Sequence, residues 1–342
     1  MTTSIRDIAE KVGKSITTVS RALHDYDDVS PETKELVRKA AQEMGYVANR
    51  QAQLLRQKST DTIGFILPTF GPRFSDPFFS EFLAGIGNKA ADHGYDLLVS
   101  TCPPGEKEIR TYQYEVQSNR VDGFIIVRTR VDDARIQYLN SIGFPFVAFG
   151  RVPGMDDMPY VDENSDVGMQ MIADYLVELG HTHIGCIAPS MEYTFATHRM
   201  QGLREGLRFH GIDLREQDVL TGDLTEKGGY ERAMELIQRP YRPTAIVALN
   251  DLMAIGAISA AQDAGLVVGK DISVTGFDNI PLSTYTHPPL TTVHQPIFQI
   301  GNMVCEMLIK IVKGMPLEEK QVLLKPSLIK RQSTGAPFLV EK

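Results

Sequence analysis

Polar and aromatic side chains in this sequence gather just after short apolar runs, in two series along the chain. Aromatic rings stack on the apolar faces of sugars, whereas Asp, Asn and Arg side chains hydrogen-bond hydroxyl groups in pairs. This mixture of residue types suits a polyhydroxylated ligand. The candidate ligand-binding residues are Phe78, Phe79, Arg128, Arg151, Phe195, Arg199, Asn250 and Asp278.

The candidate arginines have a second interpretation. Arg128, Arg130 and Arg151 are either ligand-binding residues or surface charges that pair with carboxylates such as Asp132 and Asp133. If several of them reach the ligand, a phosphorylated sugar becomes a candidate, because guanidinium groups bind phosphate through paired hydrogen bonds.

Other candidates also leave alternatives open. Phe78 and Phe79 are adjacent, and we expect one of them to pack in the core. Asp251 stands where a carboxylate caps a helix, so we expect capping rather than ligand contact. Asp278 is either a turn residue or a ligand contact, and we favour contact.

From residue 62 onward, short apolar segments that predict strands alternate with longer segments of helical periodicity. The predicted strands cover residues 62–67, 95–100, 121–127 and 145–149, and then 184–188, 219–221, 245–249 and 272–276. The predicted helices cover residues 79–93, 107–119 and 132–142, and then 167–179, 198–210, 227–238 and 252–264. Such alternation predicts parallel, doubly wound sheets, and the two series predict two α/β lobes. Because ligands of these sheets bind beyond the carboxyl ends of strands, we expect the candidates to face one shared cleft.

Three short amphipathic segments precede this α/β body. The expected helices cover residues 5–12, 15–24 and 31–44, each beginning beside a serine that can cap it. Gly13 separates the first two. Three short helices with a glycine turn favour a helix-turn-helix head, and the alternative is a generic small helical bundle.

The head and the body both carry specific motifs. They include Asp7-Ile-Ala-Glu10, Ser15-Ile-Thr-Thr-Val-Ser-Arg21-Ala-Leu23, Val29-Ser-Pro-Glu-Thr33, His198-Arg-Met-Gln-Gly202, Ala248-Leu-Asn-Asp-Leu-Met-Ala254 and Val274-Thr-Gly-Phe-Asp-Asn279. With these motifs the chain resembles the LacI/GalR family over nearly its whole length, to about Arg331. The resemblance implies a helix-turn-helix head on a two-lobed body of the periplasmic-binding-protein type. It also implies that the helical tail from 296 to 312 returns to the first lobe.

The resemblance implies roles in DNA binding for residues of the head. The helix from 15 to 23 would lie in the major groove, with Ile16, Thr17 and Arg21 at base edges. The chemistry agrees, because Arg binds guanine through two hydrogen bonds, Thr bonds to several bases, and Ile contacts a thymine methyl group. For two of the serines, at positions 4 and 15, a purely capping role is the alternative. The residues expected to contact the DNA backbone are Ser4, Ser15, Thr18, Ser20, Asn49 and Arg50.

Residues 49–57 form a helix-permissive segment of only about two turns, which is marginally stable alone in water. One interpretation is a flexible linker. By the resemblance it is a hinge helix that orders on DNA in a dimer and inserts Leu55 into the minor groove. Apolar wedges of this kind kink the duplex, so the central step of the site would have to be deformable.

The resemblance also refines the candidate ligand site. Arg199 matches the sugar-binding arginine of the family, and Asn250 and Asp278 match hydroxyl-binding positions. Asp76 departs from the family, because relatives often have Asn there. Leu224 falls about where one relative has a stacking tryptophan, which puts stacking at this position in doubt.

Length and charge agree with this organisation. The 342 residues carry a net charge of −8, but residues 1–60 hold ten Lys and Arg against eight Asp and Glu, whereas the rest hold 25 against 35. A DNA-binding end on an acidic body is compatible with this asymmetry. The expected domains are residues 1–48 (head), 49–61 (hinge and linker) and 62–342 (body), with lobe one at about 62–160 plus 292–331 and lobe two at about 161–291.

Several classes of protein are disfavoured. The chain has no run of about 18 apolar residues and no secretory signal, so we expect a cytoplasmic protein without a membrane span. Its three cysteines, Cys102, Cys186 and Cys305, fit neither a disulfide framework nor a zinc site. We expect no metal and no cofactor. The usual motifs for a nucleophilic serine, a P-loop or a zinc protease are missing from the sequence, so we expect no enzyme activity.

These observations predict a sequence-specific transcriptional regulator, most often a repressor, that responds to a sugar, a disaccharide or a sugar phosphate. Its partners would be a palindromic operator in double-stranded DNA and a second copy of the chain. The sequence has no terminal heptad repeat, which favours a homodimer over a tetramer. The alternative is a sugar-binding protein without a regulatory role, which residues 1–57 disfavour.

Overall fold

The computed structural model describes residues 3–46, 59–69 and 76–337, and the chain divides into two compact units, Met1–Ser59 and Thr60–Lys342. Each unit has its own buried apolar core. The predictions for Asn49, Arg50 and Leu55 fall outside the described residues.

Three helices form the first unit. They are α1 (Ile5–Val12), α2 (Ile16–Leu23) and α3 (Pro31–Glu43). Gly13 ends α1 with a φ of 64°, a left-handed conformation that glycine adopts without steric cost. The apolar faces meet in a core whose fully buried residues are Ile8, Val19, Ala22 and Val37. The three predicted helices and the turn between the first two are confirmed.

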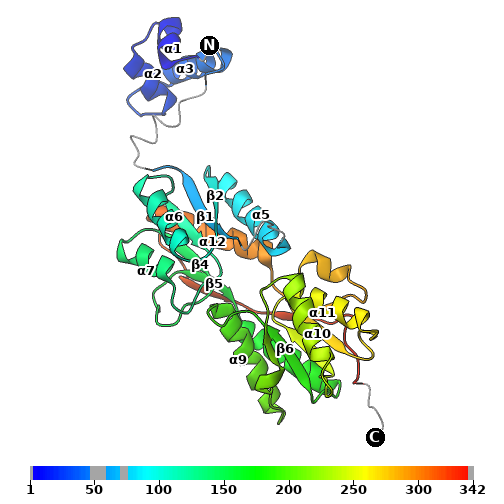
Figure 1. Ribbon diagram of the computed structural model, residues 1–342. Helices are drawn as coiled ribbons and strands as arrows, with labels where there is room; N and C mark the ends of the chain where they lie inside the picture. The colour runs from blue at the N-terminus through cyan, green and yellow to red at the C-terminus, as the bar shows by residue number, and fades with distance from the viewer. Residues whose placement is uncertain (1–2, 47–58, 70–75, 338–342) are drawn as a thin grey trace. The chain divides into compact units, whose positions relative to one another are not determined.

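The first lobe of the body is a six-stranded sheet with helices on both faces (Figure 1). Its strands are β1 (Thr62–Pro68), β2 (Asp96–Cys102), β3 (Gly123–Ile126), β4 (Phe146–Phe149), β5 (Tyr160–Glu163) and β11 (Gln321–Leu324). Its helices are α5 (Pro77–Asp92), α6 (Glu106–Gln117), α7 (Ala134–Ser141) and α12 (Ile297–Val312). The strand order is β11-β5-β4-β3-β1-β2, and all neighbours are parallel.

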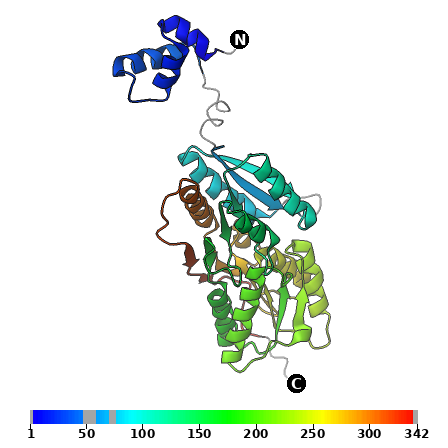
Figure 2. The ribbon, with the colours of Figure 1, turned by 90° about the vertical axis from the view of Figure 1, so that its left-hand side faces the viewer.

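The second lobe also consists of a six-stranded sheet packed against helices. In the view turned by 90°, the two lobes are seen as separate α/β units (Figure 2). Its strands are β6 (Ile184–Ala188), β7 (Val219–Thr221), β8 (Ala245–Ala248), β9 (Ser273–Asp278), β10 (Thr291–His294) and β12 (Ser327–Ile329). Its helices are α8 (Ser165–Glu178), α9 (Thr194–Phe209), α10 (Glu226–Ile237), α11 (Asp251–Asp263) and the short η1 (Glu216–Asp218) and η2 (Pro281–Thr284). The order is β12-β10-β9-β8-β6-β7, with β12 antiparallel to β10.

Between residues 76 and 337 the chain crosses from lobe to lobe three times, after β5, after β10 and after β11. The predicted return of the helical tail to the first lobe is therefore seen, and α12 packs beside α5 (Figure 1). The predicted lobe limits differ from the strand pairing. Strand β5 extends the first sheet to Glu163, whereas β10 and β12, predicted in lobe one, belong to the second sheet.

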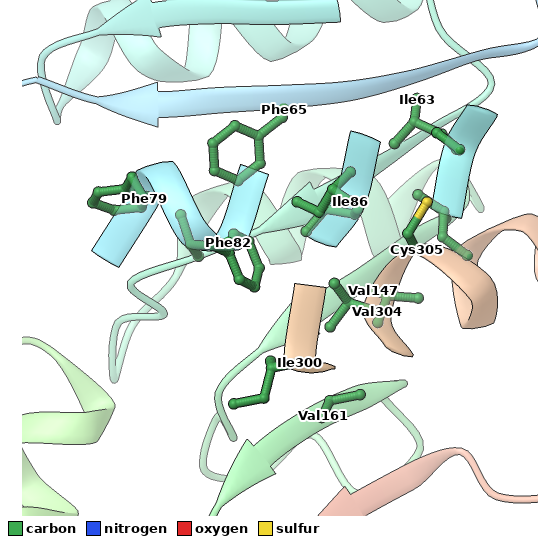
Figure 3. Close-up of a cluster of buried hydrophobic side chains, with 14 of the residues drawn as sticks. Ile63, Phe65, Phe79, Phe82, Ile86, Val147, Val161, Ile300, Val304 and Cys305 are labelled. Carbon is green, nitrogen blue, oxygen red and sulfur yellow. The ribbon is translucent and has the colours of Figure 1, made fainter. Parts of the chain in front are cut away.

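Helices α5 and α12 cover one face of the first sheet and cross each other at very close range. A Cβ atom on Gly85 would lie 2.2 Å from the Phe298 carbonyl oxygen, so glycine is required at this crossing. Apolar side chains from both helices and from the first sheet pack into one cluster (Figure 3). This cluster includes Phe65, Phe79, Phe82, Ile86, Ile300, Val304 and Cys305.

Candidate ligand cleft and nucleic-acid interface

A cavity lies between the two lobes, beyond the carboxyl ends of the parallel strands. It spans about 610 Å³ of empty space, including space that is open to solvent. Both sheets reverse their strand order here, because β1 lies between β2 and β3 and β6 lies between β7 and β8. Ligands of open α/β sheets bind at such reversal points. The predicted residues that line the cavity are Phe78, Arg128, Phe195, Arg199, Asn250 and Asp278.

An ion pair forms part of the first-lobe wall. Asp76 caps α5, and its Oδ1 accepts a hydrogen bond of 3.1 Å from the Phe78 amide. Its Oδ2 accepts a hydrogen bond of 3.0 Å from Arg128 Nη2. Burial raises the pKa of Asp76, and the neighbouring Arg128 charge offsets part of this effect. The helix cap therefore also holds the arginine at the cavity.

The apolar part of this wall is aromatic. The rings of Phe78 and Phe149 are stacked, with centroids 5.9 Å apart and planes 19° apart, and both residues line the cavity. Phe195 lines it from the second lobe and stacks on Tyr193, with centroids 5.5 Å apart. Such rings provide apolar surface for the face of a sugar ring.

Arg199 organises the second-lobe wall. Its Nη1 donates a 2.5 Å hydrogen bond to the Leu249 carbonyl oxygen, and its Nη2 donates to Asp278 at 2.9 Å and to Gln295 at 3.2 Å. The guanidinium also lies over the ring of Phe277, 3.7 Å from its centroid. Burial raises the pKa of Asp278 to about 6, although Arg199 acts in the opposite direction. Asp278 is thus a buried acceptor that is mostly ionised at neutral pH.

Asn250 combines two roles at the start of α11. Its side-chain oxygen accepts a hydrogen bond of 3.1 Å from the Met253 amide, and its Nδ2 donates to the Leu224 carbonyl oxygen at 3.3 Å. The expected helix-capping role of Asp251 is wrong, because Asn250 is the cap. The Asp251 carboxylate instead accepts a 2.8 Å hydrogen bond from the Ile280 amide and a second one from a threonine hydroxyl.

Two predicted ligand residues lie away from the cavity. Phe79 is only 1% exposed and packs against Phe65, because neighbours on a helix point about 100° apart and Phe78 takes the cavity side. The expectation that one of the two phenylalanines is a core residue is confirmed. Arg151 is held by Asp162 at 2.8 Å and Asp166 at 3.1 Å, so these carboxylates keep its guanidinium out of the cavity lining.

The lining also includes residues that were not singled out from the sequence. Phe149 ends β4, so the strand-end rule could have identified it. Asp162 lies on β5, which the sequence pattern did not predict as a strand. The lining residues outside the prediction include Val127, Phe149, Asp162, Ser165 and Gln295.

The backbone at the cavity is strained. Arg128, Leu224 and Asp278 line it with φ angles of 50°, 68° and 115°, a region that side chains other than glycine rarely adopt. Each such conformation costs on the order of 1–3 kcal/mol and persists only where the surroundings enforce it. Strain of this kind is concentrated at binding sites, which supports the cavity as the functional site.

The lobes contact each other at the edge of the cavity. The Thr194 amide donates to the Thr129 carbonyl oxygen, and the Val131 amide donates to the Glu192 carbonyl oxygen, both at 2.9 Å. The hydroxyl groups of Thr129 and Thr194 also form a hydrogen bond. These contacts hold the cleft closed on this side.

Glu163 lies in the first crossover between the lobes and is fully buried. Neither of its carboxyl oxygens has a hydrogen-bond partner among the described residues. Burial raises the pKa of Glu163 to about 8; the Arg199 charge offsets part of this effect, whereas Asp278 and Asp162 add to it. This carboxyl group is therefore mostly protonated at neutral pH.

In the head, α2 presents the predicted base-contact residues on its outer side. Ile16 is 44% exposed and Thr17 is exposed, whereas Val19 and Ala22 on the opposite side are buried. Arg21 is partly exposed and forms an ion pair with Asp28, with Nη2 and Oδ2 2.5 Å apart. A base contact by Arg21 would therefore compete with this intramolecular pair.

The predicted backbone contacts of the head have local structural roles. The Ser4 amide donates to Asp7 at 2.7 Å, and the Ser4 hydroxyl accepts from the Asp7 amide, which completes a capping box. The Ser15 hydroxyl accepts a hydrogen bond of 3.0 Å from the Thr18 amide. Both serines are therefore caps, and both are exposed, as a DNA contact would also require. Thr18 and Ser20 are partly exposed on the same helix.

Both regions of the chain match known protein families. Residues 4–49 match the family described as bacterial regulatory proteins, lacI family, and residues 173–334 match the periplasmic binding protein-like domain. The HTH-type transcriptional repressor CytR of Escherichia coli (strain K12) is 34% identical over 334 residues, which cover 97% of this chain and 96% of CytR. The chain belongs to the LacI family.

Solved structures extend this relationship. The LacI-family chain is similar to the lac repressor dimer bound to operator and the anti-inducer ONPF, with a TM-score of 0.86 and 28% identity over 98% of this chain and all of the other. It is also similar to the CelR–cellobiose complex, with a TM-score of 0.75 and 30% identity over 97% of this chain and 99% of the other. The predicted fold, a helix-turn-helix head and two doubly wound α/β lobes, is confirmed.

Membership of this LacI family makes the chain a DNA-binding transcriptional regulator rather than an enzyme, as predicted. Within the ranges that the structure describes, no helix is long and apolar enough to cross a membrane. In the same ranges, no group of three or more His, Cys, Asp and Glu side chains is arranged to hold a metal ion.

Proposed function

We propose that this regulator is a repressor that binds a palindromic operator as a homodimer and changes its DNA affinity when a sugar occupies the cavity between the lobes. The observation that carries the proposal is the composition of that cavity. Stacked aromatic rings and hydrogen-bonding Asp, Asn and Arg side chains converge on it from both lobes. This is the set of groups that binds the apolar faces and the hydroxyls of a sugar.

The described relatives support the individual parts of the proposal. The lac repressor structure is a dimer on operator DNA, and CelR was solved with cellobiose. In our proposal Arg199, Asn250 and Asp278 bind ligand hydroxyls, whereas Phe78 and Phe195 contact the ring face. Ile16, Thr17 and Arg21 contact base edges, and Leu55 enters the minor groove. We also propose that the protein acts in the cytoplasm.

A sugar changes DNA affinity only if it binds two conformations of the body with different affinity. The contacts between residues 129–131 and 192–194 belong to the closed arrangement of the lobes, and a ligand that touches both lobes stabilises that arrangement. We propose that closure is transmitted through residues 49–61 to the head.

A two-stage experiment tests the proposal. A thermal-shift screen of monosaccharides and disaccharides identifies sugars that raise the melting temperature of the full-length protein. Fluorescence anisotropy with a cognate operator duplex then measures DNA affinity with and without each hit. A change of at least fivefold is expected. Operator affinity that stays the same with every bound sugar would refute the regulatory role, and sugar binding without any operator binding would indicate a simple sugar-binding protein.

A further inference from the structure

Every carboxylate on the cavity lining already has an arginine partner. Three carboxylates line it, and each forms an ion pair with a different arginine. The pairs are Asp76 with Arg128 at 3.0 Å, Asp162 with Arg151 at 2.8 Å and Asp278 with Arg199 at 2.9 Å. Arg151 lies outside the lining and also pairs with Asp166, so the three carboxylates and two arginines on the lining carry a formal charge of −1 when all are ionised.

These pairs are shielded from solvent. The side chains of Arg199 and Asp278 are 5% and 11% exposed, and those of Arg128 and Asp76 are 14% and 19% exposed. Charges in such surroundings interact more strongly than charges in water. An arginine that turned toward an anionic ligand would leave its carboxylate buried without its ionic partner, which is strongly unfavourable.

A further arginine near the cavity is also engaged. Arg130, which follows Thr129, donates a 2.8 Å hydrogen bond to Glu108, a carboxylate with no exposed surface. Glu108 is shared with the fully buried Arg135 at 3.1 Å. Recruiting Arg130 for a ligand phosphate would disrupt this buried network.

The other polar groups on the lining carry no charge. They are the side chains of Thr129, Ser165, Asn250 and Gln295, which donate and accept hydrogen bonds as hydroxyls and amides do. Such groups pair with sugar hydroxyls without changing the charge of the site.

We infer that this cavity selects an uncharged polyhydroxylated ligand and excludes its phosphorylated counterpart. The inference rests on the proposed sugar effector and narrows its chemical class. A phosphate group carries a charge of about −1.5 to −2 at neutral pH, and it would enter a site whose three carboxylates already occupy the three arginines. A neutral sugar brings no charge into this site and can pair with its hydroxyl and amide side chains.

The test compares neutral sugars with their own monophosphates on the full-length protein. The probes are ribose and ribose 5-phosphate, glucose and glucose 6-phosphate, and cellobiose and cellobiose 6′-phosphate. Titration calorimetry and thermal shift give the affinity of each. For every sugar that binds, we expect the phosphate to bind at least tenfold more weakly.

A variant connects this selectivity to the ion pairs. Asp76→Asn removes one negative charge from the cavity wall, and Asn caps a helix about as well as Asp, so α5 should be preserved. We expect the preference for the neutral sugar to shrink at least threefold. Asp157→Asn is the matched control, because Asp157 is 91% exposed and pairs with Lys320. This control should keep the preference of the wild type.

The possible outcomes distinguish a failure of the charge-selectivity inference from a failure of the proposed sugar effector. Tighter binding of any monophosphate than of its neutral sugar by the wild type would overturn the inference but leave the sugar effector in place. An unchanged preference in a folded Asp76→Asn protein would overturn the role of the matched charges. If none of the six probes, nor any sugar in the wider screen, binds to a protein that still binds operator, the sugar-effector proposal itself fails, and this inference fails with it.

Discussion

The hydroxyl groups of Thr129 and Thr194 lie 2.5 Å apart, and the two residues belong to different lobes. Thr129 follows β3 in the first lobe, and Thr194 begins α9 in the second. Both residues are about 1% exposed. Opening of the cleft must break this buried hydrogen bond, so the pair reports on the closed state.

Replacing Thr194 with Val should therefore weaken closure. Val keeps the branched shape but removes the hydroxyl, and one intramolecular hydrogen bond contributes on the order of 1 kcal/mol. We expect the affinity for a bound sugar to fall by about fivefold in titration calorimetry. Thr111→Val is the control, because the Thr111 hydroxyl bonds to the Lys107 carbonyl oxygen within α6. Equal sugar affinity in both variants would show that the contact between the lobes does not contribute.

Asp278→Asn should remove the response to the effector while leaving DNA binding intact. Asn can still accept the hydrogen bond from Arg199, but it lacks the charge of the carboxylate and is a weaker acceptor for ligand hydroxyls. We expect at least a tenfold loss of sugar affinity. Asp213→Asn, on a side chain that is 86% exposed in the same lobe, should bind sugar normally. A normal response of the Asp278 variant would remove this residue from the site.

The wild type should show a related pH dependence. Because the pKa of Asp278 is raised to about 6, its carboxylate is mostly ionised at pH 7.5 and mostly protonated at pH 5. We expect sugar affinity to fall as the pH drops through 6, measured by calorimetry at fixed ionic strength. The Asp278→Asn variant should lack this step, and an identical step in both proteins would assign it to another group.

Glu163 should make the folded protein less stable as the pH rises. This is the opposite direction to the pH dependence expected for sugar affinity. Its pKa in the folded protein, about 8, lies above its ordinary value of 4.5, so its contribution to stability is complete below pH 4.5 and is lost as the pH rises through 8. Between pH 6 and 8 the loss is roughly 2 kcal/mol, since one pKa unit corresponds to about 1.4 kcal/mol. Glu163→Gln should abolish this loss in urea unfolding. A pH profile identical to that of the wild type would show that Glu163 ionises normally.

Arg21→Ala should lower discrimination between operator sequences, because one paired guanine contact contributes roughly 1–3 kcal/mol. Arg50→Ala should instead weaken binding to all duplexes alike, as a backbone contact does.

Asp28→Asn adds a third comparison, because the Asp28 carboxylate forms an ion pair with Arg21 within the head. We expect this variant to bind operator more tightly. Anisotropy titrations with cognate and mutated duplexes measure all three, and equal discrimination by Arg21→Ala and the wild type would contradict the assignment.

Local sequence pattern was sufficient for the elements that alternate regularly. The predicted strand 184–188 agrees with β6, and the predicted helix 252–264 agrees with α11 to within one residue. The strands β5, β10, β11 and β12 were not predicted. They are three or four residues long, and their identity as strands comes from neighbours far away in the sequence, such as β11 beside β5.

The distinction between local sequence signals and contacts with distant residues also applies to the candidate site. Arg199 and Asp278 were predicted from motifs, and they meet at the cavity. Arg151 could not be assigned in the same way, because its position depends on Asp162 and Asp166, which the sequence pattern does not connect to it. Which of two adjacent phenylalanines faces the ligand likewise depends on where α5 begins.

Each sheet of the body is completed by a strand that comes late in the chain, β11 in the first lobe and β12 in the second. During synthesis the head can fold as soon as it leaves the ribosome, whereas β5 and β10 each lack one neighbouring strand until residues 321–329 have been made. Unpaired strand edges attract other chains. The nascent body, rather than the DNA-binding head, is therefore the part that a chaperone would need to shield.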